Sequence, residues 1–266
     1  MNKAYISAFL RKLGLIRLMD RLGFVLQKIK YRRANNAFRK ANPDVCLPPD
    51  YIIYESFSLN YEAYYNQSKG TAERLTGFFE KHIDLSKVRI LDWGCGPGRV
   101  IRHFPGLLAE GCGFFATDYN RVSIDWCKEH IPGVQFSVNQ LAPPMDYQDG
   151  FFDIVYGISV LTHLSEELHH AWFEELCRVC KPGGIMYLTT QGEAFKARLT
   201  TPEVARFERG ELVVRSKTRE GHRTFSAFQP EGFMRKMMQG VEVLEHVSRE
   251  PEGNYIPQDI WIIKKL

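Results

Sequence analysis

The stretch Leu91–Arg99, LDWGCGPGR, decides the fold. An apolar run over 88–92 is predicted to be a strand that ends at Asp92, and glycines follow at 94, 96 and 98 before a helix predicted over 99–108. Glycines permit a positive φ and let a ligand approach the backbone closely. The first strand-to-helix turn of a doubly wound α/β sheet is where nucleotides bind. We therefore expect a ligand site at this turn.

The glycine spacing favours one kind of ligand over another. A dinucleotide fingerprint requires its third glycine at position 99, where this chain has Arg99. Asp92 places a carboxylate just before the loop, which a phosphate ligand would not favour. A ligand that carries a positive amino group and a sulfonium fits this charge better.

A second acidic residue, Asp118, ends the next predicted strand, 113–117, in FFATD. A carboxylate at this point can accept hydrogen bonds from both hydroxyls of an adenosine ribose. Asp118 lies one helix plus one strand beyond the glycines, as that role requires. The alternative is that Asp118 is only a turn residue at a strand end.

Strands and helices alternate from residue 88 onward, which predicts a parallel sheet with crossover helices. A stretch from Gln191 to Gln229 interrupts the alternation, and a hairpin is predicted inside it between 211–216 and 224–228. Long insertions are often functional, so we interpret 191–229 as a lid-like segment. The other predicted strands are 134–138, 152–156, 185–189, 241–246 and 259–264, and the other predicted helices are 71–82, 123–130 and 166–180.

The basic charge of the chain is concentrated at its start. Residues 1–40 hold eleven Lys or Arg against one acid, Asp20, whereas the whole 266-residue chain has a net charge of +4. A proline-punctuated linker, 42–50, follows. We therefore divide the chain into a basic helical extension with its linker, 1–50, and a catalytic domain, 51–266.

The extension is predicted to be helical over 3–40 and to be split at Gly14. Its apolar residues from Leu15 to Ile29 recur at helical spacing on one face, with Arg17 and Arg21 beside them. A basic amphipathic helix can lie on an anionic membrane surface. It can equally dock on its own domain or on a second subunit.

The six cysteines have no framework spacing, which indicates reduced thiols in a cytoplasm. Cys177 and Cys180 lack a second pair or a nearby His, so no metal site is expected. There is no run of 18 apolar residues, and we find no secretory signal. The predicted location is cytoplasmic, and peripheral at the inner membrane surface if the extension binds lipid.

Four segments in this order resemble the class I, Rossmann-like methyltransferases that depend on S-adenosylmethionine. They are LDWGCGPGR at 91–99, FFATD at 114–118, FFDIVYGISVLTHL at 151–164 and CKPGGIMYLTT at 180–190. The resemblance implies a doubly wound, seven-stranded, mostly parallel sheet with an antiparallel last strand, preceded here by the helical N-terminal extension. ANPDVCLPPDY, APPM and VEVLEHV…QDIWIIKK further resemble bacterial methyltransferases linked to polysaccharide or glycan synthesis.

The resemblance also implies which residues contact S-adenosylmethionine. Glycine-loop residues would line its methionine end, Asp118 its ribose and Tyr119 its adenine. Asn139 stands where an acid commonly meets the adenine amino group, and its amide oxygen can accept the same bond. The complete implied set is Asp92, Gly94, Cys95, Gly96, Asp118, Tyr119, Asn139, Gln140, Leu141, Gly157 and Ser159.

His163 is the best candidate for a general base, because it follows the fourth strand and histidine titrates near neutrality. The alternative is that His163 only supports its loop. His222 and Arg223 in the insertion are candidates to contact substrate, as opposed to lying in a solvated turn. Tyr61 and Tyr65 are candidates to stack on a sugar or the adenine, as opposed to packing in a core.

The function predicted first is methyl transfer to a hydroxyl of a small molecule or glycan. A protein or nucleic-acid methyltransferase is the second reading. The N-P-P-[YF] motif of amino-methylating DNA enzymes is replaced here by YGIS at 156–159, so nucleic acid is not the expected partner. The third reading is a non-catalytic domain that binds cofactor or a partner.

Overall fold

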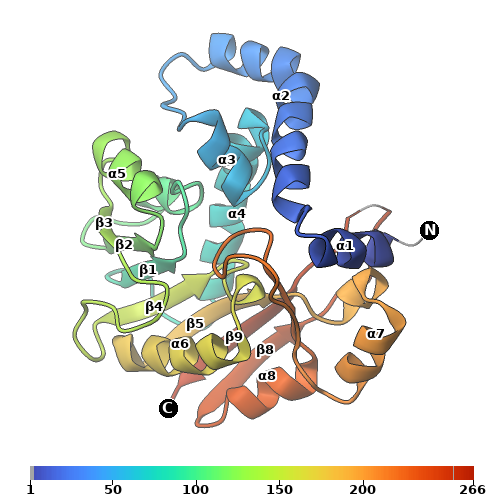
Figure 1. The fold of residues 1–266 in the computed structure, drawn as a ribbon. Coiled ribbons are helices and arrows are strands. Elements are labelled where there is room, and N and C mark those ends of the chain that lie inside the picture. The colour runs from blue at the N-terminus through green and yellow to red at the C-terminus, as the bar shows by residue number, and fades with distance from the viewer. Residues whose placement is uncertain (1–2, 254) are drawn as a thin grey trace. The chain divides into compact units, whose positions relative to one another are not determined.

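The computed structural model describes residues 3–253 and 255–266 (Figure 1). The chain forms two compact units: residues 18–139 are one, and residues up to 17 together with 140–266 are the other. The strands form a seven-stranded sheet in the order β3-β2-β1-β4-β5-β9-β8.

The predicted fold class is confirmed. Within the first unit, β1 pairs with β2 and β2 with β3, both parallel. Within the second, β4 pairs with β5 in parallel, and β9, the last strand, runs antiparallel to both β5 and β8. The bounds are β1 (Arg89–Trp93), β2 (Gly113–Asp118), β3 (Gln135–Val138), β4 (Phe152–Gly157), β5 (Cys180–Thr190), β8 (Val241–Val247) and β9 (Asp259–Lys265).

Among the described residues, α1 (Lys3–Lys12) and three further helices precede β1; the three are α2 (Ile16–Ala41), α3 (Asp50–Ser56) and α4 (Tyr61–Phe79). The sequence predicted a helix only from 71, but α4 begins ten residues earlier. The Asn60 side chain caps it by accepting a hydrogen bond from the Ala63 N–H. Most of its buried residues recur every three or four positions, so they form one helical face.

The helix predicted over 99–108 is shorter and tighter in the structure, a 3₁₀ segment η1 (Ile101–Gly106). Pro105 lies inside it and supplies no backbone N–H, which prevents a regular α-helix from continuing. The next helix, α5 (Arg121–His130), begins after Asn120, whose side chain accepts from the N–H groups of Val122 and Ser123.

In the second unit, the segment 191–229 carries its own elements. They are η3 (Glu193–Arg198), α7 (Thr201–Glu208) and the predicted hairpin, which is confirmed as β6 (Val213–Arg215) paired antiparallel with β7 (Ser226–Phe228). The remaining helices are α1 (Lys3–Lys12), α6 (Glu166–Val179) and α8 (Glu231–Met237). The split of the N-terminal helix near Gly14 is confirmed.

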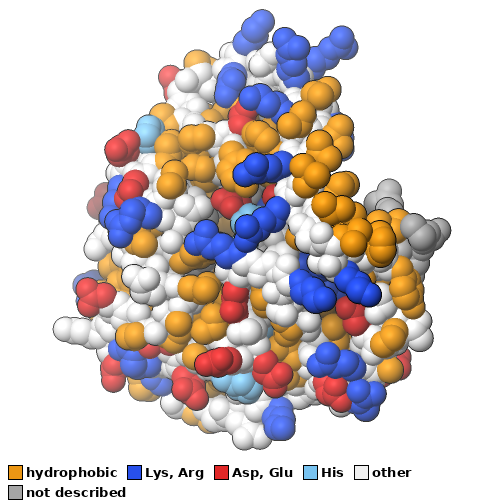
Figure 2. Space-filling view, viewed as in Figure 1, with side chains coloured by type: hydrophobic (Ala, Val, Ile, Leu, Met, Phe, Trp, Pro, Cys, Tyr) orange, Lys and Arg blue, Asp and Glu red, His pale blue; other side chains and the backbone are white. Residues whose placement is uncertain are grey.

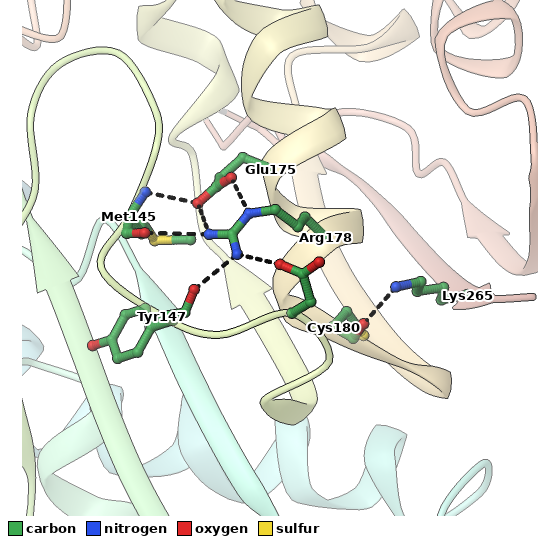
Figure 3. A network of polar contacts seen from close by, with 7 residues as sticks. Met145, Tyr147, Glu175, Arg178, Cys180 and Lys265 are labelled. Carbon is green, nitrogen blue, oxygen red and sulfur yellow. Dashed lines mark hydrogen bonds and ion pairs between the residues drawn. The ribbon is translucent and has the colours of Figure 1, made fainter.

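Helix α6 holds the segment that leads into β4 through one polar network (Figure 3). Glu175 accepts from the Met145 N–H at 2.7 Å and pairs with Arg178 at 2.7 and 2.8 Å. Arg178 also donates to the carbonyls of Met145 and Tyr147 and to Asp149. A single buried carboxylate and its guanidinium partner thus anchor residues 145–149.

Among the described residues, the search for a helix with the length and hydropathy of a membrane span finds none.

Candidate functional site

The glycine loop after β1 has a backbone that only glycine adopts readily. Gly94, Gly96 and Gly98 all have positive φ, between +53° and +74°. The N–H groups of Gly94 and Cys95 donate to the Thr117 carbonyl at 2.8 and 3.1 Å, which ties the loop to the end of β2. The loop is therefore fixed at the carboxyl ends of two neighbouring parallel strands.

Asp118 is placed directly against this loop. One carboxylate oxygen accepts from the Gly96 N–H and the other from the Asn120 N–H, both at 2.8 Å. A carboxylate has about four acceptor positions, so two remain for a ligand. Asp118 is only 9% exposed, and this burial raises its pKa, with the nearby Glu55 adding to the rise. The carboxylate is oriented before any ligand arrives.

Tyr64 also holds the glycine loop in place. Its hydroxyl donates to the Pro97 carbonyl at 2.8 Å and accepts from Arg102 at 3.0 Å. Tyr64 is fully buried, and burial raises its pKa, so the hydroxyl keeps its proton. The sequence gives no signal for this hydrogen bond, because a hydroxyl that bonds a loop carbonyl leaves no sequence pattern.

The end of α3 also reaches the loop, which the sequence did not predict. Glu55 accepts from the Asn120 side-chain amide at 3.2 Å, beside Asp118. A Cβ built on Gly96 would lie 3.2 Å from the Cβ of Ser56. Glu55 and Ser56 are thus additional candidates to contact a ligand on this loop.

The other predicted cofactor residues of this unit lie at the same strand ends. Asp92 is buried, with 4% exposed, and Tyr119 is half-buried. The Asn139 side-chain oxygen, expected to meet an adenine amino group, accepts from the Thr117 hydroxyl at 2.7 Å. That oxygen can accept one further bond. Burial raises the pKa of Cys95 well above its ordinary value, so Cys95 offers a ligand only its backbone and a neutral thiol.

The two tyrosines predicted to stack on a ligand differ in the structure. Tyr61 is 2% exposed, and its hydroxyl donates to Asp50 at 2.5 Å and accepts from Arg39 at 2.6 Å. Tyr61 therefore packs in the core of the helical segment. Tyr65 lies edge-on to His103 of η1, with ring centroids 5.0 Å apart, and remains partly exposed.

In the second unit, His163 ends the 3₁₀ segment η2 (Leu161–His163) after β4. Its Nδ1 lies 2.8 Å from the Phe225 carbonyl, and since a carbonyl only accepts, Nδ1 carries the proton. In the neutral ring, Nε2 is then the proton acceptor. Burial lowers the pKa of His163, and Arg223 and His222 lower it further, so the ring is neutral at pH 7.

Gly157 and Ser159 stand just before His163, at the end of β4. Among the described residues, Ser159 is the one residue other than glycine that has a positive φ, at +64°. Its N–H donates to the Thr189 hydroxyl at 2.8 Å. Its hydroxyl bonds Thr162 at 2.9 Å and accepts from Gln258 at 2.8 Å. Strained conformations of this kind concentrate at functional sites.

The insertion is tied to this segment. The Gly221 N–H donates to the His163 carbonyl at 2.9 Å, and the Glu220 carboxylate accepts from the Ser165 N–H. His222 accepts from the Thr224 N–H at 3.2 Å, and both His222 and Arg223 are half-buried. The insertion thus holds the imidazole through the Phe225 carbonyl and places the Arg223 cation near it.

Two predicted residues, Gln140 and Leu141, lie at the start of the second unit's main segment. Gln140 is exposed, and the Leu141 carbonyl accepts from the Trp172 indole at 2.9 Å. No group of three His, Cys, Asp or Glu that could hold a metal occurs in the part of the chain that the structure describes.

Residues 90–184, which contain the glycine loop, Asp118 and His163, match the model of a family described as a methyltransferase domain. A solved S-adenosylmethionine-dependent methyltransferase from Methanosarcina mazei has the same fold, with a TM-score of 0.53 and 20% identity over 71% of this chain and 97% of that one. Residues 90–184 thus match a methyltransferase-domain model, and the chain shares the fold of that S-adenosylmethionine-dependent enzyme.

Curated relatives are similar over part of the chain. An uncharacterized methyltransferase of Schizosaccharomyces pombe is 30% identical over 52% of this chain and 51% of its own length. A ubiquinone biosynthesis O-methyltransferase of Rickettsia akari is 27% identical over 47% and 48%. A tRNA (carboxymethyluridine(34)-5-O)-methyltransferase of Arabidopsis thaliana is 36% identical over 38% and 23%. The chain thus spans about half or less of these relatives, and their names give the glycan resemblance no support.

Proposed function

We propose that this chain transfers a methyl group from S-adenosylmethionine to a hydroxyl oxygen of a small-molecule acceptor. The observation that carries the proposal is the arrangement of Asp118 on the glycine loop. A buried carboxylate is oriented by two backbone N–H groups and keeps acceptor capacity beside three positive-φ glycines.

The charges and hydrogen-bonding groups of these residues suit S-adenosylmethionine. Asp118 would bind the ribose hydroxyls, and the glycine backbone would approach the methionine end, where Asp92 supplies a negative charge for the amino group and sulfonium. Tyr119 and Asn139 would meet the adenine. When bound, S-adenosylmethionine supplies an activated methyl group on a good leaving group.

The remaining chemical task is to remove the proton of the acceptor hydroxyl. We assign it to His163, whose Nδ1 is held by the Phe225 carbonyl and whose Nε2 is the basic nitrogen. Its lowered pKa keeps this nitrogen unprotonated at neutral pH. The strained Ser159 and the loop around His222 and Arg223 would position the acceptor.

Two of the relatives named above are O-methyltransferases by name, which supports oxygen as the attacked atom. The relative that acts on tRNA keeps a nucleic-acid acceptor as the second candidate. We favour a small molecule because the basic residues are concentrated in the N-terminal extension and not in the methyltransferase domain.

The cofactor part of the proposal is tested by calorimetry with S-adenosylmethionine and with its demethylated product. We expect both to bind, and Asp118→Ala to weaken binding by about tenfold or more, because two or more hydrogen bonds to a charged acceptor are lost. Asp125→Ala is the matched control, since Asp125 is an exposed acid on α5 of the same unit. An unchanged affinity in Asp118→Ala would remove Asp118 from the site.

The assignment of His163 needs a separate readout. His163→Gln should lower kcat by about 10²–10⁴-fold and leave the affinity for S-adenosylmethionine unchanged. Because the pKa of His163 is lowered, kcat/KM of the wild type should stay constant from pH 8 down to below the ordinary histidine range. Equal loss of cofactor affinity and of kcat would instead indicate a structural role.

A further inference from the structure

We propose that helix α2 docks the protein on an anionic membrane surface through an apolar stripe that its own unit leaves uncovered. The stripe consists of Leu18, Met19, Leu22, Val25, Leu26 and Ile29, all of which are exposed. Leu26 and Ile29 are 66% and 69% exposed, which is far more than a core helix would allow. Figure 2 shows the hydrophobic side chains that run along α2.

The opposite face of α2 already makes the contacts that attach it to its unit. The Asp20 carbonyl accepts from the Tyr54 hydroxyl at 2.8 Å, and a Cβ on Gly23 would lie 2.8 Å from that hydroxyl oxygen. The Gln27 side chain accepts from the Leu59 N–H at 2.8 Å.

Further along the same face, Asn35 is buried and bonds both the Leu59 carbonyl and the Tyr61 N–H, at 3.1 and 3.0 Å. Phe38 packs beside it in the cluster that contains Tyr61. At 100° per residue, positions 20, 27, 35 and 38 lie about 140–160° from the centre of the stripe. The stripe is therefore not the face by which the helix docks on its own domain.

Exposed cations surround the stripe. Arg21 and Arg32 border it on one side, Lys30 borders it on the other, and Arg33 continues its line by one turn. Over its 26 residues α2 carries eight Lys or Arg against one acid, Asp20. Asp20 points to the opposite face, toward Tyr54. An apolar stripe bordered by cations is complementary to a surface with negative headgroups over acyl chains.

This charge also argues against the other occupants. In a symmetric dimer the same patch meets itself, so the Arg and Lys borders would face their own copies and repel. A nucleic acid would neutralise the cations. It would, however, cover the six apolar side chains with phosphate and sugar, so the stripe would contribute nothing to binding. The stripe and its border together fit lipid best.

The test uses the full chain and flotation with vesicles of phosphatidylcholine, with and without phosphatidylserine. We expect binding to the anionic vesicles only, and weaker binding at high salt. Leu26→Glu with Ile29→Glu should reduce binding by about a hundredfold or more, because two large apolar side chains no longer enter the interface. Val122→Glu is the matched control: it replaces an equally exposed apolar residue, 65%, on α5, and binding should be unchanged.

A second set of variants tests the charge. Arg21→Gln, Arg32→Gln and Arg33→Gln together should weaken binding about a hundredfold, at about fivefold per cation. Removal of three other exposed cations, by Lys81→Gln, Lys87→Gln and Lys128→Gln, should weaken it much less. Both sets keep the inner face of α2 intact, so circular dichroism should show folded proteins.

Three results would overturn the proposal. One is equal binding to neutral and anionic vesicles by the wild type and the stripe variants. Another is a concentration-dependent dimer in sedimentation that Leu26→Glu with Ile29→Glu abolishes, without any vesicle binding. The third is binding of a single-stranded RNA probe that competes away all anionic vesicle binding and is equally sensitive to the stripe variant.

Discussion

The glycine loop allows a quantitative test at Gly98. Its φ is +67°, and a Cβ added there would lie 2.7 Å from Ile131 Cδ1, with Cys127 Sγ and a Phe136 ring carbon at ordinary contact distances of 3.4 and 3.5 Å. Gly98→Ala therefore combines two separate penalties. The left-handed conformation costs about 1–2 kcal/mol for a residue with a Cβ. Moving the end of a buried Ile131 off its rotamer costs about 0.5–1.5 kcal/mol more.

The summed loss is about 1.5–3.5 kcal/mol of the free energy of unfolding, which corresponds to roughly 3–7 °C in Tm for a chain of this size. Urea unfolding followed by circular dichroism measures it. Gly77→Ala is the control, because Gly77 lies exposed in α4 with nothing within 4 Å of its added Cβ. That substitution should be neutral or stabilise the protein by up to about 1 kcal/mol.

The steric part can be isolated, because Ile131→Val removes the one atom that clashes. Alone, Ile131→Val should cost about 0.5–1.5 kcal/mol. In that background the cost of Gly98→Ala should fall by about 1 kcal/mol, so the two changes are not additive. If Gly98→Ala costs the same in both backgrounds, the close packing of Ile131 on the loop is refuted. The affinity for S-adenosylmethionine should fall in Gly98→Ala and recover in part in the double variant.

Three further changes test the rest of the structure. Glu175→Ala should destabilise the protein by about 2–3 kcal/mol in urea unfolding, because it leaves the Met145 N–H and the Arg178 guanidinium without their carboxylate. Asn35→Leu should cost about 2–4 kcal/mol by the same assay, since two backbone groups at the start of α4 lose their buried partner. Burial lowers the pKa of His169 to about 4, so protonation of this ring favours the unfolded chain. The contribution of His169 to the free energy of unfolding is therefore fully present above its ordinary pKa of 6.5. It is lost as the pH falls toward 4, at up to about 1.4 kcal/mol per pH unit.

Each of these three changes has a control variant. Glu175→Gln keeps an acceptor for the backbone N–H and should retain part of the stability, whereas equal loss in both variants would contradict the ion-pair argument. Asn36→Leu replaces an exposed neighbour and should have little effect. His169→Asn should flatten the pH dependence of the urea midpoint between pH 4 and 6.5, and the same change at the exposed His170 should not. An unaltered slope in His169→Asn would show that other groups cause it.

Local sequence patterns determined much of the fold and of the candidate ligand-binding loop. The alternation of apolar strands with amphipathic helices predicted the sheet, and the hairpin in 191–229 formed where it was predicted. Gly94, Gly96, Gly98 and Asp118 could be identified because their roles follow from residue type and spacing. Backbone conformation and a strand-end carboxylate are local properties, so they can be predicted from the sequence.

Tertiary structure alone decided what lies against those residues. Tyr64 on the Pro97 carbonyl, Glu55 beside Asp118 and Phe225 on the His163 ring join positions that are 33 or more residues apart, and no periodicity encodes such pairs. The same holds for α2, whose sequence predicted one apolar stripe and no inward face. Its attachment uses Gln27 and Asn35, polar side chains that satisfy backbone groups at the start of α4. A hydrogen bond to a distant backbone group needs only a donor or acceptor at the right distance, and many polar residues could supply one. Such a bond can therefore be recognised only once the folded structure shows which partners lie together.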